Sequence, residues 1–242
     1  MSARSDSILA SLKAVDAERR HRSEAADLDA KVAALKTFQQ RRFSRTYADL
    51  LLTDRYGPAV RFFLEELYGP NDFTRRDAQF ARVVSGLVRL FPQEVVDTVA
   101  SVAELHALSE ELDTAMATRL AHPDIVAADY VRAWQEVGRA ADRQRQVSLT
   151  LDVANRLDRF TRIPMLRKSL HLMRAPARAV RVAELQRFLE MGFDTFRAMN
   201  GALEFVAIVR AREQAFADVL FATDAADLGR GSPAAGALAA LS

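Results

Sequence analysis

Residues 62–77 read Phe62-Phe63-Leu64-Glu65-Glu66-Leu67-Tyr68-Gly69-Pro70-Asn71-Asp72-Phe73-Thr74-Arg75-Arg76-Asp77, and this stretch combines a helix, its stop signal, a turn and the start of a second helix. Apolar side chains recur at the spacing that covers one side of a short helix. Gly69 favours the left-handed conformation that ends a helix, and Pro70 cannot continue one. Thr74 and Asp77 are spaced as in a capping box, so the next helix is predicted to begin near Thr74.

The same segment also carries a family resemblance. The pattern FFLEELYGPxDFxxRD runs through Phe62-Phe63-Leu64, Tyr68-Gly69-Pro70, Asp72-Phe73 and Arg76-Asp77. It resembles an uncharacterised family of bacterial, all-helical proteins, and the likeness covers about residues 40–215. The resemblance implies a helical fold and carries no known activity, substrate or cofactor.

Helical spacing of apolar residues continues through most of the chain, whereas alternating runs bounded by hairpin turns are missing. The sequence therefore predicts an all-α fold, a multi-helix bundle of about eight or nine helices with a long N-terminal helix. No strong helix breaker occurs between Ser7 and Thr53. Pro92 begins the longest predicted helix, and Pro123 opens another that can continue to Thr161.

Three segments are expected along the chain. Residues 1–24 carry few large apolar side chains and are predicted to form an N-terminal helical extension that is dispensable for folding. Residues 25–224 are predicted to form a single helical domain, since 242 residues suffice for one sizeable core. Residues 225–242 lack a periodic apolar face and are predicted to be a disordered tail.

The amino-acid composition excludes several kinds of catalytic and metal-binding site. The chain has no cysteine, which excludes disulfides, thiolate catalysis and cysteine-ligated metals. The longest apolar run near the start is Ile8-Leu9-Ala10, far shorter than a signal-peptide core, and no stretch has the length of a membrane span. We expect a cytoplasmic protein without a membrane span.

No catalytic, cofactor or metal site can be assigned. Nucleophile elbows and phosphate-binding glycine loops are missing from the predicted helical domain. His106 and Glu110 are four apart on one predicted helix and could share a metal, but a di-iron bundle would need Glu-x-x-His on two helices. We interpret His106 as structural and predict no metal, no cofactor and no catalytic residue.

An apolar pocket is one functional hypothesis. The C-terminal half is rich in Phe and Met at helical spacing, which is typical of core but can also wall a ligand pocket. The candidate pocket residues are Tyr68, His106, His171, Phe193 and Phe196.

Segregated charge is the other hypothesis. Residues 94–113 carry six Asp or Glu and no Lys or Arg, whereas residues 159–181 carry seven Lys or Arg and no Asp or Glu. Either these segments neutralise each other, or the basic segment contacts an anionic ligand or a protein partner. Leu166, Leu170 and Met173 are expected on the buried side of their helix. The candidate contact residues beside them are Arg167, Lys168, Arg174 and Arg178.

The basic segment has one aromatic residue, Phe160, that could stack on a base, which argues against nucleic acid as the partner. We therefore expect a non-enzymatic interaction or regulatory module that uses the basic face of residues 159–181. The alternative is a helical enzyme or carrier that binds a small apolar ligand among the C-terminal helices. The sequence leaves the partner and the oligomeric state open.

Overall fold

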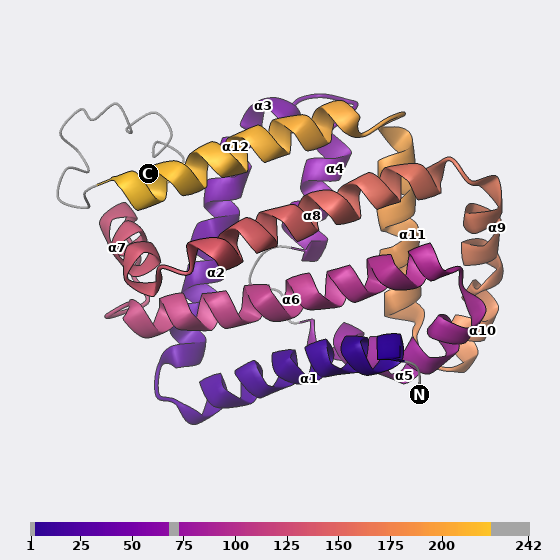
Figure 1. Cartoon of the computed structure of the whole chain (residues 1–242), viewed down its shortest axis with the longest axis horizontal. Coiled ribbons are helices and arrows are strands. Elements are labelled where there is room, and N and C mark those ends of the chain that lie inside the picture. Colours follow the sequence, from indigo (N-terminus) through magenta and orange to yellow (C-terminus); the bar gives the residue numbers. More distant parts are fainter. Residues whose placement is uncertain (1–2, 68–72, 224–242) are drawn as a thin grey trace.

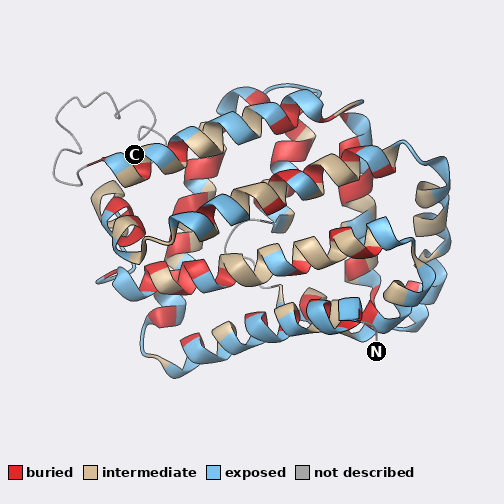
Figure 2. Ribbon diagram, viewed as in Figure 1, coloured by how far each residue is buried: buried red, intermediate tan, exposed pale blue. Residues whose placement is uncertain are grey.

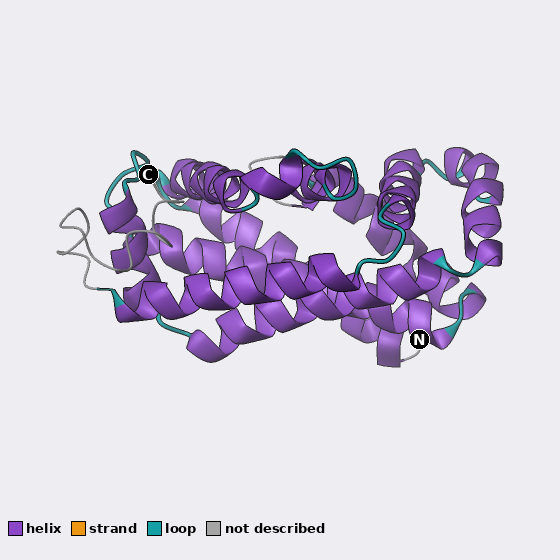
Figure 3. Ribbon diagram, turned by 90° about the horizontal axis from the view of Figure 1, so that it is seen from above, coloured by secondary structure: helices purple, strands orange, loops and turns teal. Residues whose placement is uncertain are grey.

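The computed structural model describes residues 3–67 and 73–223, and within these residues all regular structure is helical (Figures 1 and 3). The prediction of an all-α fold is confirmed. The helices are α1 (Ala3–Glu24), α2 (Leu28–Thr46), α3 (Ala48–Leu51), α4 (Gly57–Phe62), the π-helical turn η1 (Phe63–Leu67), α5 (Thr74–Leu90), α6 (Gln93–Arg119), α7 (Ala127–Val137), α8 (Ala140–Thr161), α9 (Pro164–Leu172), α10 (Arg174–Ala179), α11 (Ala183–Ala198) and α12 (Leu203–Ala222). These exceed the predicted eight or nine, because segments as short as α3 and α10 show no helical period in the sequence.

Four long helices lie side by side in the order α1, α6, α8, α12, and α2, α4 and α11 cross behind them (Figure 1). Helix α7 closes the end of the molecule where α12 finishes. Helices α9 and α10 lie at the opposite end, beside the start of α6 and the end of α8. The two ends of the bundle therefore differ, since α7 packs into the core at one end, whereas two short helices lie at the other.

Burial follows the layers, with red residues on the inward faces of the long helices (Figure 2). One apolar cluster joins α2, α6, α7 and α12, and includes Phe38, Met116, Tyr130 and Trp134. A second joins α2, α4, α8, α11 and α12, and a third joins α1, α5 and α6. All three border α2 or α6, so these helices form the centre of the fold.

Two predicted continuous helices are interrupted. The chain reverses between α1 and α2 at Asp27, whose φ is 62°, although nothing between Ser7 and Thr53 signals a break. Aspartate tolerates this left-handed conformation because its short side chain can bond locally. The helix expected to start at Pro123 begins instead at Ala127, and it ends at Gly138, whose φ is also 62°. Gly138 was the available signal for that second break.

The described residues of the 62–77 segment largely form the helices predicted for them. A helix runs through α4 and η1, and α5 begins at Thr74 as expected; residues 68–72 lie outside the described part of the chain. Phe62 packs on Gly192 of α11, where a Cβ would lie 3.0 Å from the Phe62 ring. The prediction of a capping box was wrong. Thr74 is the first residue of α5 and not its N-cap. The Asp77 carboxylate accepts hydrogen bonds from Arg19 and His106 instead.

Helix α1 does not protrude from the domain. Ile8 and Val15 are fully buried, Ile8 within the cluster formed with α5 and α6, and Arg22 is buried as well. The sequence suggested little burial because α1 has a narrow apolar stripe, yet small partners such as Ala103 let that stripe approach closely. The predicted tail, residues 225–242, falls outside the described residues.

Candidate functional site: an open apolar cleft beside α9

Two proline corners face each other at one end of the bundle. Phe91 has an extended backbone and Pro92 precedes α6, so the chain turns sharply between α5 and α6. Ile163 is likewise extended and Pro164 is the first residue of α9, so the chain turns again after α8. Both prolines are visible in the sequence as helix starts, but their proximity in space is not.

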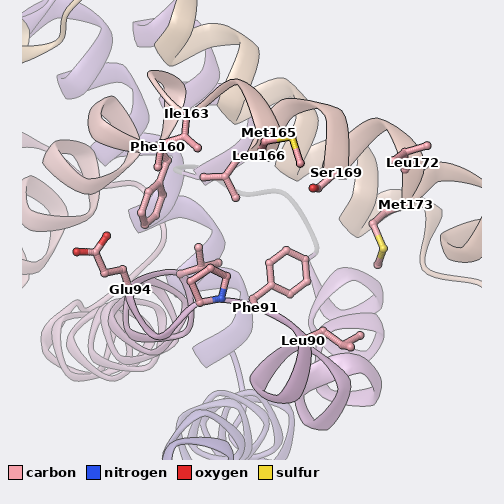
Figure 4. Close-up of a pocket in the computed structure, with 12 residues that line it drawn as sticks. Leu90, Phe91, Glu94, Phe160, Ile163, Met165, Leu166, Ser169, Leu172 and Met173 are labelled. Carbon is pink, nitrogen blue, oxygen red and sulfur yellow. The ribbon is translucent and has the colours of Figure 1, made fainter.

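An open cleft lies between these corners, and we refer to it as the α9 cleft (Figure 4). Its volume is about 520 Å³. Ten of its lining residues are apolar and two are polar. They are Leu90, Phe91, Pro92, Glu94, Val95, Phe160, Ile163, Met165, Leu166, Ser169, Leu172 and Met173.

Large apolar side chains on the rim of the cleft face solvent. Leu90 and Leu172 are each 76% exposed, and Met165 is 68% exposed. No residue of α9 is buried, although Leu166, Leu170 and Met173 were expected on a buried side. These three residues are half-buried rather than buried, because Leu166 and Met173 line the open cleft. Large exposed apolar groups gathered in one place mark binding surfaces on soluble proteins.

The basic segment is neutralised in part, and by a different helix from the one considered. Arg167 pairs with Asp194 at 2.9 Å, and Arg174 pairs with Glu190 at 2.6 Å, both on α11. The hydrogen bond from Arg174 is the main reason that the pKa of Glu190 falls to about 2. Within the described residues, no ion pair is found for Lys168 or for Arg178.

The acidic segment has partners of its own. Asp97 pairs with Arg4 at 3.0 Å, and Glu104 pairs with Arg145 at 2.7 Å. Glu111 pairs with Arg139 at 2.6 Å. Among the described ion pairs, none joins residues 94–113 to residues 159–181, so the two segments do not neutralise each other.

The predicted pocket residues are not brought together. Phe193 and Phe196 are buried in the core, and His171 is exposed on α9. His106 Nε2 lies 2.9 Å from Asp77, which also pairs with Arg19. None of these four lines the α9 cleft, and Tyr68 lies outside the described residues.

The residues of the cleft were missed because their apolar pattern is ordinary for a helix face. The only available signal was density: Ile163, Met165, Leu166, Leu172 and Met173 lie within eleven residues of one short helix and its ends. A nine-residue helix between a proline and a second short helix has few neighbours to cover that many apolar groups.

A second polar feature, the ionic cluster, lies inside the bundle. Arg22 of α1 and Lys36 of α2 both reach the Glu110 carboxylate of α6, at 2.6 and 2.5 Å. Arg22 also donates to Thr114, and Gln39 donates to Asp113. These six residues tie α1 and α2 to α6.

The two carboxylates of the ionic cluster titrate in opposite directions. Burial alone would raise the pKa of Glu110, but Lys36 and Arg22 lower it to about 2. Burial raises the pKa of Asp113. Such shifts are typical of functional sites and also of structural ion pairs. The contacts of the ionic cluster are all between helices of this chain, which indicates a structural role.

No metal site is found in residues 3–67 and 73–223: no three His, Cys, Asp or Glu side chains there could hold an ion together. The helices of this part of the chain also include none that is both long and apolar enough to cross a bilayer.

The family described as a domain of unknown function (DUF8198) matches residues 18–227, so the chain belongs to that family. The resemblance to an uncharacterised family is thereby confirmed. No curated protein and no solved structure matches the chain.

Proposed function

We propose that this member of a family without an assigned activity is a non-enzymatic interaction module whose contact surface is the α9 cleft and the cations around it. One observation carries the proposal: α9 has no buried residue, yet it presents Met165 and Leu172 to solvent beside an open cleft of about 520 Å³. Leaving that much apolar surface in water is costly unless a partner covers it.

The chemistry of the lining supports contact over catalysis. The polar groups in the cleft are one carboxylate, Glu94, and one hydroxyl, Ser169. General acid and base catalysis needs titratable groups with shifted pKa values around a reacting atom. Met165 and Met173 instead supply flexible apolar contacts, which are common on surfaces that adapt to partners.

The four basic candidates divide into two pairs under this proposal. Arg167 and Arg174 hold α9 and its junction with α10 against α11 through their ion pairs, so we assign them a positioning role. Lys168 and Arg178 are exposed and form no ion pair with the described residues, so we assign them to the contact surface.

A small apolar ligand is the second candidate occupant, because 520 Å³ falls within the ~300–1,000 Å³ typical of ligand pockets. Under that alternative, native mass spectrometry of the purified protein detects a bound small molecule that is lost from a Leu172→Asp variant.

Site-specific photocrosslinking tests the proposal. A benzoylphenylalanine placed at Leu172, in cells that naturally make the protein, is expected to give a discrete adduct with another macromolecule. The same group at Leu52, which is 89% exposed and lies outside the cleft, is the matched control. The adduct should vanish when Met165→Asp is added. Equal adducts at both positions, or no adduct at Leu172, would contradict an interaction surface at the cleft.

A further inference from the structure

We infer that the occupant of the α9 cleft is an amphipathic helix of a partner protein, with an apolar stripe flanked by Asp or Glu. This inference rests on the proposed function and specifies its partner. Three features of the cleft support it: its shape, the flexibility of its lining, and the charge on its rim.

The walls of the cleft have the form of a helix-binding groove. One wall is a single face of α9, formed by Met165, Leu166, Ser169, Leu172 and Met173 at helical spacing (Figure 4). The other wall is the corner between α5 and α6. Nine residues give α9 a length of about 14 Å. An amphipathic helix of about three turns can lie along this wall and fill the groove with its apolar stripe.

An exposed cation borders the cleft on the α9 wall. Lys168 lies three residues after Met165 and four before Leu172, so it is next to both on the surface of α9. Lys168 is exposed and forms no ion pair with any described residue. Carboxylates on the α9 side of the apolar stripe of a bound helix would find this cation within reach.

The carboxylate of Glu94 makes the two ends of the cleft differ in charge. It is exposed and lines the end of the cleft next to Phe160, whereas Leu90 and Leu172 lie at the other end (Figure 4). A carboxylate of the partner is therefore favoured beside Lys168 and disfavoured beside Glu94. The preference for Asp or Glu over Lys should therefore vary with position along the bound helix.

The same observations argue against an anionic membrane surface. Membrane-surface helices bury a convex apolar face in the lipid, whereas these apolar groups line a concave cleft. Arg167 and Arg174 are already paired with Asp194 and Glu190, so they contribute little attraction to anionic lipid.

A peptide selection tests the inference. A displayed library of 16-residue helical peptides keeps Leu at one stripe and varies the flanking positions among Glu, Lys and Gln. Selection against the folded protein is expected to enrich Glu over Lys by about two- to fivefold per position on the Lys168 side, as an exposed ion pair provides. Positions that face Glu94 should show no enrichment of Glu.

Two matched variants locate the effect. Lys168→Glu should reverse the bias toward Lys. Lys13→Glu makes the same change of charge at an exposed position of α1 and should leave the bias intact. Circular dichroism confirms that each variant keeps its helices.

The outcomes separate the two proposals. Peptides that bind only when Leu172 is intact, but show no preference for Glu, would overturn the acidic helix and leave the interaction surface standing. Failure to enrich any peptide that depends on Leu172 would overturn the helical partner. Sedimentation with phosphatidylglycerol vesicles at 150 mM salt, lost with Leu172→Asp, would replace it with a membrane surface. If neither peptides nor vesicles depend on Leu172, the acidic helix falls, and the photocrosslink at Leu172 decides whether the interaction surface stands.

Discussion

Replacing Glu110 with Gln is expected to lower the free energy of unfolding by about 3–5 kcal/mol, the cost of leaving a buried charge without its partner. Glu110 is 4% exposed and accepts contacts from Arg22, which is equally buried, and from Lys36. The amide of Gln keeps the shape but removes the negative charge. Urea denaturation followed by circular dichroism measures the difference.

Glu111 is the matched control in the next position of the same helix. It pairs with Arg139, but Glu111 is exposed and Arg139 is only half-buried, so the pair is open to solvent. Glu111→Gln is expected to cost only about 0–1 kcal/mol, because water and salt screen an exposed pair. Equal losses for the two variants would show that the ionic cluster does not hold α1 and α2 on α6.

The same residue should contribute strongly to the acid dependence of stability. The pKa of Glu110 is held at about 2 in the folded protein, below its ordinary 4.5. A lowered carboxyl pKa contributes stability above the unfolded value and loses it as the pH falls through the folded value. The loss attributable to Glu110 should therefore fall between about pH 4.5 and pH 2. Asp113, whose pKa is raised, acts in the opposite direction. The Glu110→Gln variant should lose less stability than the parent over this interval, and parallel curves would exclude Glu110 as the cause.

Removal of residues 1–24 is expected to unfold the domain or to lower its melting temperature steeply. The deletion removes Ile8 and Leu12 from the cluster with α5 and α6, and it also removes the fully buried Val15. It also removes Arg22 from Glu110 and Arg19 from Asp77, so two buried carboxylates each lose a cationic partner at once. This reverses the expectation from the sequence that the segment is a dispensable extension.

If the chain without residues 1–24 aggregates, point variants test the packing of α1 instead. Ile8→Ala and Val15→Ala should together cost several kcal/mol, because each deletes fully buried methyl groups. Lys13→Ala, at an exposed position of the same helix, should have almost no effect. A shortened chain with the parent's melting temperature would contradict a docked α1.

Local signals in the sequence predicted helices far better than they predicted what the helices bury. Pro92, Thr74 and Pro164 mark the starts of α6, α5 and α9, because proline and turn chemistry act within a few residues. The break at Asp27 was missed because a single left-handed aspartate leaves no strong pattern. Burial of α1 was missed because it depends on Arg22, whose ion pair partner is 88 residues away.

The α9 cleft was even harder to predict from local sequence signals than the burial of α1. Lys168 and its neighbours drew attention through their charge, which the sequence displays directly. The cleft beside them depends on the corner at Phe91 meeting α9, and no local pattern reports that meeting. Apolar residues at helical spacing look the same whether a neighbouring helix covers them or leaves them open. Only the packing showed that Met165 and Leu172 are uncovered.

The methionine methyl groups give the most direct test of the α9 cleft as the contact surface. Met165 and Met173 line the cleft, whereas Met116 and Met199 are fully buried in the core and serve as internal references. We propose to titrate protein labelled with ¹³C at the methionine methyls with the acidic helix enriched by selection. We expect shifts of the Met165 and Met173 signals, whereas the signals of Met116 and Met199 should not move. Shifts at Met116 or Met199 without change at Met165 and Met173 would contradict the α9 cleft as the contact surface.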